Sequence, residues 1–141
     1  MKIFPFEFDT KYLIQMRNSI EVPMNESNPE QIQRLENDQE LWGNEQNGTY
    51  RGVSYYARRN SYCKYWCGYI IPNTEISEDM YDRLDEIAHG GITGHRGGPG
   101  FDCAHYGDFM LGSNILNDGV YRDYPYVLNT MKMMIDALLD E

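Results

Sequence analysis

The chain has 141 residues and a formal net charge of −10 at pH 7, and 41% of its residues are hydrophobic. A single domain over residues 1–141 with a buried core is expected at this length and composition. The acidic excess argues against direct binding to nucleic-acid phosphates or to anionic membranes. All three histidines lie between residues 89 and 105, and that segment is the natural place to search for a site.

Residues 1–48 are expected to form a helical and extended N-terminal extension to a core over 49–141. Apolar alternation predicts an edge strand over 3–8, and helical spacing predicts a helix over 10–20. The first residues lack the long apolar stretch of a signal peptide, and no window has the roughly 18 apolar residues that span a bilayer. A cytoplasmic protein with reduced cysteines is therefore expected.

A further helix is predicted to begin at Pro29, with Asn28 as its N-cap, and to end before Gly43. The residues expected to face inward are Ile32 and Leu35, with Leu41 and Trp42 as further candidates. Asn47-Gly48 is typical of a tight turn.

Tyrosines and β-branched residues dominate 50–71 and predict a hairpin whose strands are divided by residues 58–61. Ser77 is expected to cap a helix that ends at Ala88, although a strand over 84–93 stays open. Apolar residues with a period of 3.6 predict a C-terminal helix over 125–139. With strands near 89–108, these elements predict an α+β fold, a small antiparallel sheet packed against the C-terminal helix.

The segment from His89 to Asp108 differs in composition from the rest of the chain, because it holds seven of the thirteen glycines. Glycine lets a backbone approach a ligand closely, and histidine, aspartate and threonine can transfer protons or bind polar groups. Ordering many glycines costs conformational entropy, so the pattern favours a functional loop. Residues 94–100 alone are equally typical of a mobile surface loop.

The spacing fits no Walker A loop and no dinucleotide-binding glycine motif. A metal site built from His89, His95, His105, Asp102 and Asp108 is chemically possible, but the spacing matches no metal-binding motif. We therefore predict neither a metal nor a cofactor.

Two catalytic arrangements remain open. Cys103 could act as a nucleophile with His89 or His105 as its base, or it could be a small buried residue. Asp102, His105 and Asp108 are three residues apart, and on a helix either carboxylate would orient the imidazole of His105. In the structural alternative, a carboxylate caps a turn and His105 supports the loop.

Other polar and aromatic residues have simpler interpretations. Arg96 is a candidate for an anionic ligand, whereas Arg58 and Arg59 are expected to be solvated surface charges. Cys63 and Cys67 on one strand would lie about 13 Å apart, too far to share a metal ion, so small buried cysteines are favoured. Phe101 and Tyr106 could stack on a ligand ring or fill the core, and the core is the favoured expectation.

Two motifs carry a family resemblance. HGGIT at 89–93 and GFDCAHYGD at 100–108 resemble the motifs of a family of small bacteriophage proteins. The segments 67–72 and 121–127 are also similar to family segments, so the resemblance covers residues 52–141. Members often carry a longer insert with paired tryptophans where this chain has only residues 94–99.

The family has no settled activity, so the resemblance implies a phage accessory protein of the host cytoplasm that could counter a host defence system. The leading hypothesis is binding of a small polar or anionic, nucleotide-like ligand, with a host defence protein as the other possible partner. The expected contacts are His89, Gly90, Gly91, Thr93, Arg96, Asp102, His105 and Asp108.

Two alternatives belong to other functional classes. A small hydrolase would use His105 or His89 as general base, assisted by Asp102 or Asp108, with or without a metal. An inhibitor of a host nucleic-acid enzyme would use the C-terminal helix or acidic residues such as the six within 75–86, although such a run is usually a solvated helix face. The sequence leaves open whether the protein turns over a substrate.

Overall fold

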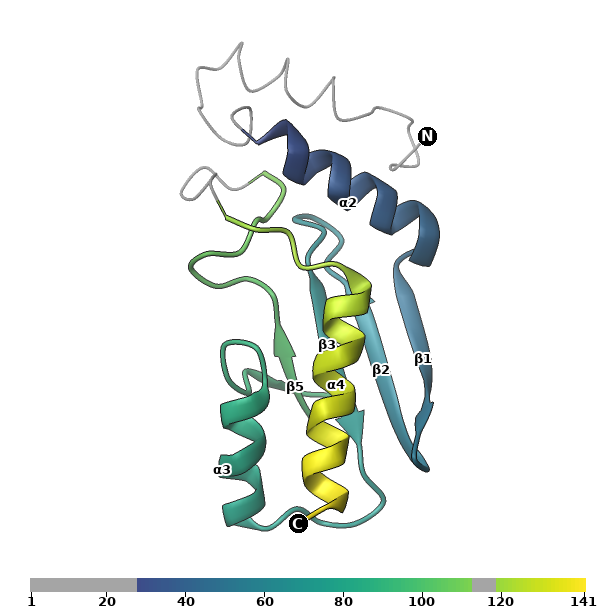
Figure 1. Cartoon of the computed structure of the whole chain (residues 1–141), viewed down its shortest axis with the longest axis vertical. Coiled ribbons are helices and arrows are strands. Elements are labelled where there is room, and N and C mark those ends of the chain that lie inside the picture. The colour runs from purple at the N-terminus through teal and green to yellow at the C-terminus, as the bar shows by residue number, and fades with distance from the viewer. Residues whose placement is uncertain (1–27, 113–118) are drawn as a thin grey trace.

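The computed structural model describes residues 28–112 and 119–141, which form an α+β fold. A five-stranded antiparallel sheet has the strand order β1-β2-β3-β5-β4, and α4 lies across one of its faces (Figure 1). The predicted fold class is confirmed. The strand expected over 3–8 and the helix expected over 10–20 lie outside the described residues. None of the helices in the described part is long and apolar enough to cross a membrane.

The strands of the sheet are β1 (Glu45–Tyr50), β2 (Val53–Arg59), β3 (Trp66–Ile71), β4 (Gly94–His95) and β5 (Pro99–Asp102). The predicted hairpin is confirmed, because β2 pairs antiparallel with β3. The short β4 and β5 pair along the edge of the sheet, within the region where further strands were expected.

The turn predicted at Asn47-Gly48 is wrong, because both residues lie inside β1. The chain turns instead at Arg51 and Gly52, which both have positive φ. Gly48 pairs with Tyr55 of β2, and the end of the Tyr55 side chain occupies the space that a Cβ atom on Gly48 would need. This glycine therefore makes room for a cross-strand tyrosine.

Helix α2 (Pro29–Trp42) has the predicted bounds and buries Ile32 and Leu35. Leu41 is 74% exposed, so its expected inward position is wrong. The side chain of Asn28 forms no capping hydrogen bond, which also contradicts the prediction.

Helix α3 (Glu78–Ile87) begins as predicted, with the Ser77 hydroxyl accepting a hydrogen bond from the backbone N–H of Met80 at 3.1 Å. The strand considered over 84–93 does not form, since residues 84–87 are helical. Helix α4 (Tyr124–Leu139) is capped by Asp123. Close to its end Leu139 is 44% exposed, contrary to the predicted apolar stripe.

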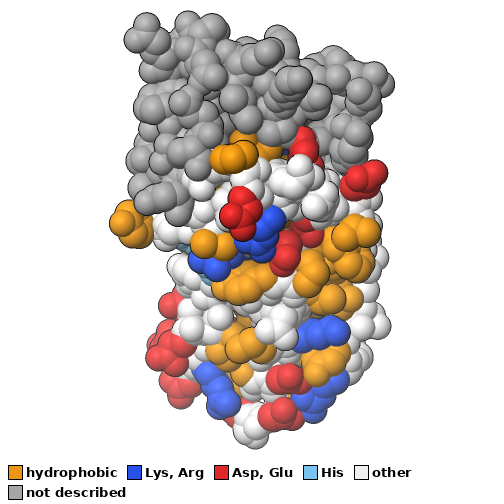
Figure 2. Space-filling view, turned by 45° about the horizontal axis from the view of Figure 1, so that its top comes forward, with side chains coloured by type: hydrophobic (Ala, Val, Ile, Leu, Met, Phe, Trp, Pro, Cys, Tyr) orange, Lys and Arg blue, Asp and Glu red, His pale blue; other side chains and the backbone are white. Residues whose placement is uncertain are grey.

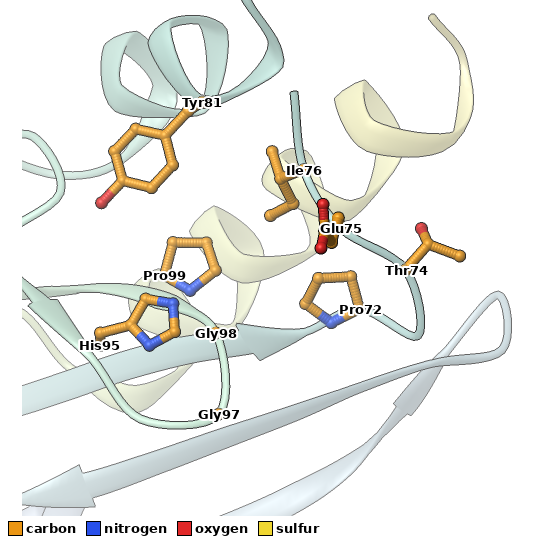
Figure 3. Close-up of a pocket in the computed structure, with 9 residues that line it drawn as sticks. All are labelled: Pro72, Thr74, Glu75, Ile76, Tyr81, His95, Gly97, Gly98 and Pro99. Atoms are coloured by element: carbon orange, nitrogen blue, oxygen red, sulfur yellow. The ribbon is translucent and has the colours of Figure 1, made fainter. Parts of the chain in front are cut away.

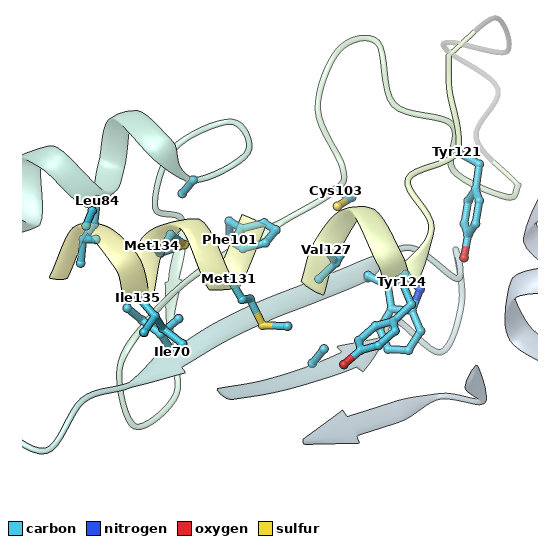
Figure 4. Close-up of a cluster of buried hydrophobic side chains, with 14 of the residues drawn as sticks. Ile70, Leu84, Phe101, Cys103, Tyr121, Tyr124, Val127, Met131, Met134 and Ile135 are labelled. Atoms are coloured by element: carbon cyan, nitrogen blue, oxygen red, sulfur yellow. The ribbon is translucent and has the colours of Figure 1, made fainter. Parts of the chain in front are cut away.

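The core lies between α4 and the sheet, and α3 closes one side of it (Figure 4). Gly68 of β3 lets α4 pack close to the sheet, because a Cβ atom there would lie 3.0 Å from side-chain atoms of Phe101 and Val127. Burying each large apolar side chain contributes about 1.5–3 kcal/mol. The largest fully buried side chains are Trp66, Tyr121, Phe101, Phe109, Ile32, Leu35, Ile70, Leu84, Met131, Met134, Ile135 and Val127.

A buried polar network connects α2 to the start of α4. Oδ2 of Asp38 accepts hydrogen bonds from the Tyr121 hydroxyl at 2.6 Å and from Nε1 of Trp66 at 2.8 Å. Its Oδ1 accepts from the backbone N–H of Tyr124 at 3.0 Å. Arg59 is only 5% exposed and pairs with Asp38 at 3.4 Å, so its predicted role as a solvated surface charge is wrong.

Candidate functional site

The centre of the candidate site is a contact between His89 and Asp108. Nε2 of His89 lies 2.8 Å from Oδ2 and 3.0 Å from Oδ1 of Asp108, which is only 1% exposed. His89 follows the end of α3, whereas Asp108 lies in the segment after β5. The fold thus joins the two motifs that carry the histidines.

Two further donors satisfy the carboxylate of Asp108. Nε of Arg122 donates at 2.8 Å and the backbone N–H of His105 donates at 3.0 Å. Burial alone would raise the pKa of Asp108, but the hydrogen bonds from His89, Arg122 and the His105 backbone outweigh it and lower the pKa. Asp108 is therefore a stable anion around which the donors are fixed.

Arg122 reaches Asp108 because the chain before α4 runs beside the GFDCAHYGD segment. Asp108 and Val120 form a bridge, with the N–H of Phe109 donating to Val120 and that of Val120 donating to Gly107. A Cβ atom on Gly119 would lie 2.5 Å from the backbone of Asp108, so the approach requires glycine there.

A second carboxylate–imidazole pair lies next to the first. Nε2 of His105 is 3.2 Å from Oδ1 of Asp102, within ion-pair distance but without hydrogen-bond alignment. The hydroxyl of Thr93 donates to Oδ2 of Asp102 at 2.8 Å. The rings of His89 and His105 have centroids 5.7 Å apart, so the two pairs form one site.

The predicted helical arrangement of Asp102, His105 and Asp108 is wrong. Asp102 ends β5, and His105 and Asp108 follow it in a turn where the N–H of Asp108 donates to the carbonyl of His105. Each carboxylate consequently contacts a different imidazole: Asp102 faces the ring of His105, whereas Asp108 binds the ring of His89.

The glycines of HGGIT hold this geometry. Gly90 and Gly91 both have positive φ, a conformation that suits glycine. Asp85 of α3 accepts a hydrogen bond from the N–H of Ile92 at 2.7 Å, which ties the helix to the loop. Gly90 and Gly91 thus shape the loop of the site, and their predicted contact with a ligand stays a prediction.

Arg122 and Tyr126 are site residues that the sequence reasoning missed. The Tyr126 hydroxyl lies 2.7 Å from Nδ1 of His89, and the guanidinium of Arg122 lies 5.3 Å from the centroid of the Tyr126 ring. The sequence signal that singled them out was their position in the segment 121–127. We call the assembled group the histidine cluster: His89, Thr93, Asp102, His105, Asp108, Arg122 and Tyr126.

The cysteines are poor candidates for nucleophiles. Cys103 is 1% exposed, and burial raises the pKa of its thiol well above the ordinary value. Burial likewise raises the pKa of Cys67 to about 11, although this residue is only half-buried. Cys63 is also half-buried and precedes β3, so the predicted shared strand with Cys67 is wrong.

Several predicted residues lie elsewhere. Arg96 is exposed in the β4–β5 turn, where its backbone N–H donates to the carbonyl oxygen of Gly98, so its described contacts are outside the histidine cluster. Phe101 is buried as predicted, but Tyr106 is 90% exposed and does not enter the core.

Within the described ranges, no group of three or more His, Cys, Asp or Glu residues is arranged to hold a metal ion. A depression of about 370 Å³ lies between the start of α3 and the β4–β5 turn, near Tyr81, His95 and Pro99 (Figure 3). It shares no residue with the histidine cluster. The cluster is therefore a surface edge of convergent polar groups, separate from this hollow.

The acidic residues of 75–86 are exposed on and before α3, and Figure 2 shows acidic side chains gathered along the margin of the molecule where α3 lies. Asp85 differs from the others because it also holds the HGGIT loop. At least one acidic residue of 75–86, Asp85, thus has a structural role.

Comparisons with known proteins found no relative of this chain. The chain matches no protein-family model, no curated protein and no solved structure. The chemistry of the histidine cluster is therefore the basis for a proposed function.

Proposed function

We propose that the protein binds a small polar or anionic, nucleotide-like ligand at the histidine cluster. One observation carries the proposal: two imidazoles lie side by side, each against its own carboxylate, at a partly exposed edge of the fold. A carboxylate partner fixes the orientation of an imidazole and reduces the entropy lost when a ligand binds it.

Two side chains of the cluster, those of Arg122 and His105, are placed to contact an anionic ligand. Asp108 is buried and saturated by its donors, and Arg122 offsets its charge. The side chains of Arg122 and His105 are 28% and 29% exposed, so an incoming ligand can reach both. Guanidinium and imidazole groups are common partners of phosphates and carboxylates.

The test is a thermal-shift screen followed by calorimetry, with adenine nucleotides, ADP-ribose derivatives and cyclic dinucleotides. Cyclic dinucleotides are included because of the resemblance to phage proteins, since some of these compounds are signals of bacterial defence systems. A saturable rise in Tm is expected for at least one compound. Silence across the whole panel with folded protein would overturn the proposal.

Matched variants locate the binding site. Arg122→Gln and His105→Gln are expected to weaken binding at least about tenfold, the loss of one charge-assisted hydrogen bond. Arg96→Gln is the control, because Arg96 is an exposed arginine whose described contacts lie outside the cluster. Equal losses in Arg96→Gln and Arg122→Gln would place binding elsewhere.

A second candidate function is hydrolysis of such a ligand, favoured by the chain of contacts from Asp108 through His89 to Tyr126. A protonated Nε2 donating to Asp108 leaves Nδ1 of His89 as an acceptor, the arrangement of a general base. Release of product from the same panel is expected to disappear in His89→Gln and to persist in His95→Gln, whose histidine lies outside the cluster. Absence of turnover by folded wild-type protein would exclude this candidate.

A further inference from the structure

Tyr126 occupies a constrained position in the first turn of α4. Its backbone N–H donates to the Asp123 side chain at 3.0 Å, which fixes the start of the helix. Its ring meets the ring of His89 edge-on, with centroids 5.4 Å apart and an interplanar angle of 89°. The backbone and the ring of Tyr126 are therefore each fixed by a contact, while the residue remains 37% exposed.

We propose that Tyr126 is a nucleophile, activated by His89, that attacks phosphoryl electrophiles. The proposal goes beyond ligand binding, because it assigns a bond-forming role to the phenol oxygen of Tyr126. The three groups Tyr126, His89 and Asp108 have the order of nucleophile, base and orienting carboxylate. The distances are 2.7 Å from the phenol oxygen to Nδ1 and 2.8 Å from Nε2 to the carboxylate.

The phenol needs a base because it retains its own proton. Burial is the main reason that the pKa of Tyr126 lies above its ordinary value; Arg122 opposes the shift, and Cys103 and Asp108 add to it. A free phenolate is therefore scarce at neutral pH. His89 can accept the proton as the new bond forms, because its other nitrogen donates to an ionised carboxylate.

The step balances as a phosphoryl transfer. The bond between Oη of Tyr126 and phosphorus forms, and the bond between phosphorus and the leaving oxygen breaks. The phenolic proton passes to Nδ1 of His89 and then to the leaving oxygen, which departs as an alcohol. Water can reverse the sequence, since it gives a proton to His89, attacks phosphorus and restores the phenol.

The neighbours of Tyr126 favour phosphorus over a neutral acyl group. The guanidinium of Arg122 lies over the Tyr126 ring and shares the Asp108 carboxylate with His89, and His105 lies beside His89. A phosphoryl group carries negative charge on its equatorial oxygens during transfer, which a guanidinium stabilises.

The proposal is tested with a dialkyl fluorophosphate, a phosphorus electrophile whose fluoride leaves when a nucleophile attacks. Peptide mass spectrometry of the labelled wild-type chain is expected to place the adduct on Tyr126. The internal controls are Tyr62 and Tyr106, which are 85% and 90% exposed. Base assistance predicts labelling of Tyr126 at least about 100-fold faster than of either control, whereas exposure alone predicts the reverse order.

Two variants complete the experiment. His89→Gln is expected to reduce Tyr126 labelling to the rate of the control tyrosines, and Tyr126→Phe to abolish the adduct. The comparison within the wild-type chain stands even if His89→Gln does not fold. Labelling in order of exposure, or a rate unchanged in folded His89→Gln, would overturn the proposal. Because labelling needs no natural ligand, failure of the ligand screen and failure of this inference are distinguishable.

Discussion

The ring of His105 occupies the space that a Cβ atom on Gly90 would need. Gly90 also has a φ of +72°, so a side chain there would be strained even in open space. The two motifs are thus packed against each other, with the glycine of one directly beneath the histidine of the other. This contact places His105 beside Asp102 and next to His89.

Gly90→Ala is expected to destabilise the fold by about 2–4 kcal/mol, the sum of left-handed strain and a displaced ring. The control is Gly107→Ala, because Gly107 also has positive φ but nothing lies within 4 Å of its added Cβ. Strain alone predicts about 1–2 kcal/mol for the control. Chemical denaturation measures both, and equal losses would contradict a role for the Gly90–His105 contact.

Asp38→Asn tests the buried network that anchors α4. The substitution leaves Arg59 without its buried counter-charge, which costs about 3–5 kcal/mol. Asp140→Asn is the matched control, because Asp140 pairs with Arg51 at 2.8 Å on the exposed surface. An ion pair this exposed contributes little to the free energy of unfolding. If urea denaturation gave similar losses for the two variants, the network would not be the anchor proposed here.

Regular patterns explain why much of the fold could be predicted. The apolar period of α4 and the Ser77 cap of α3 are local signals, and both elements form where they were expected. The turn predicted at Asn47-Gly48 does not form. This dipeptide favours a turn, but pairing of Gly48 with Tyr55 in the sheet overrides that preference. The burial of Arg59 could not be predicted from local sequence, because its partner Asp38 lies 21 residues away in the chain.

The residue types of the site were predictable, but their pairing was not. Histidines and aspartates in HGGIT and GFDCAHYGD indicated polar chemistry, and His89, Asp102, His105 and Asp108 do converge. Tyr126 comes from a helix 37 residues beyond His89, and no local spacing connects the two. Packing of α4 against α3, together with pairing of the segment before α4 with residues 107–109, brings Tyr126 and Arg122 into the cluster.

Cys103→Ala tests the exclusion of a cysteine nucleophile. Because the Cys103 thiol is buried with a raised pKa, thiol reagents at neutral pH are expected to leave it unmodified until the chain unfolds. The variant should retain ligand binding and Tyr126 labelling, with a stability loss of about 1 kcal/mol for the small cavity. Rapid modification of Cys103 in the folded protein, or loss of labelling in the folded variant, would restore it as a candidate.

The stability of the fold should depend on the ionisation of Asp108. Because its folded-state pKa is lowered, the contribution is complete above the unfolded pKa of about 3.9 and is lost as pH falls through the lower folded value. Asp108→Asn is expected to cost about 3–5 kcal/mol at neutral pH, since it leaves Arg122 and His89 facing a neutral group.

The gap in unfolding free energy between wild type and Asp108→Asn should therefore narrow once the pH falls below about 4. Denaturation at a series of pH values measures this gap. Asp79→Asn is the control, because Asp79 is an exposed residue in the first turn of α3. A gap that stays constant from about pH 7 to about pH 3 would show that Asp108 contributes through its shape and not through its charge.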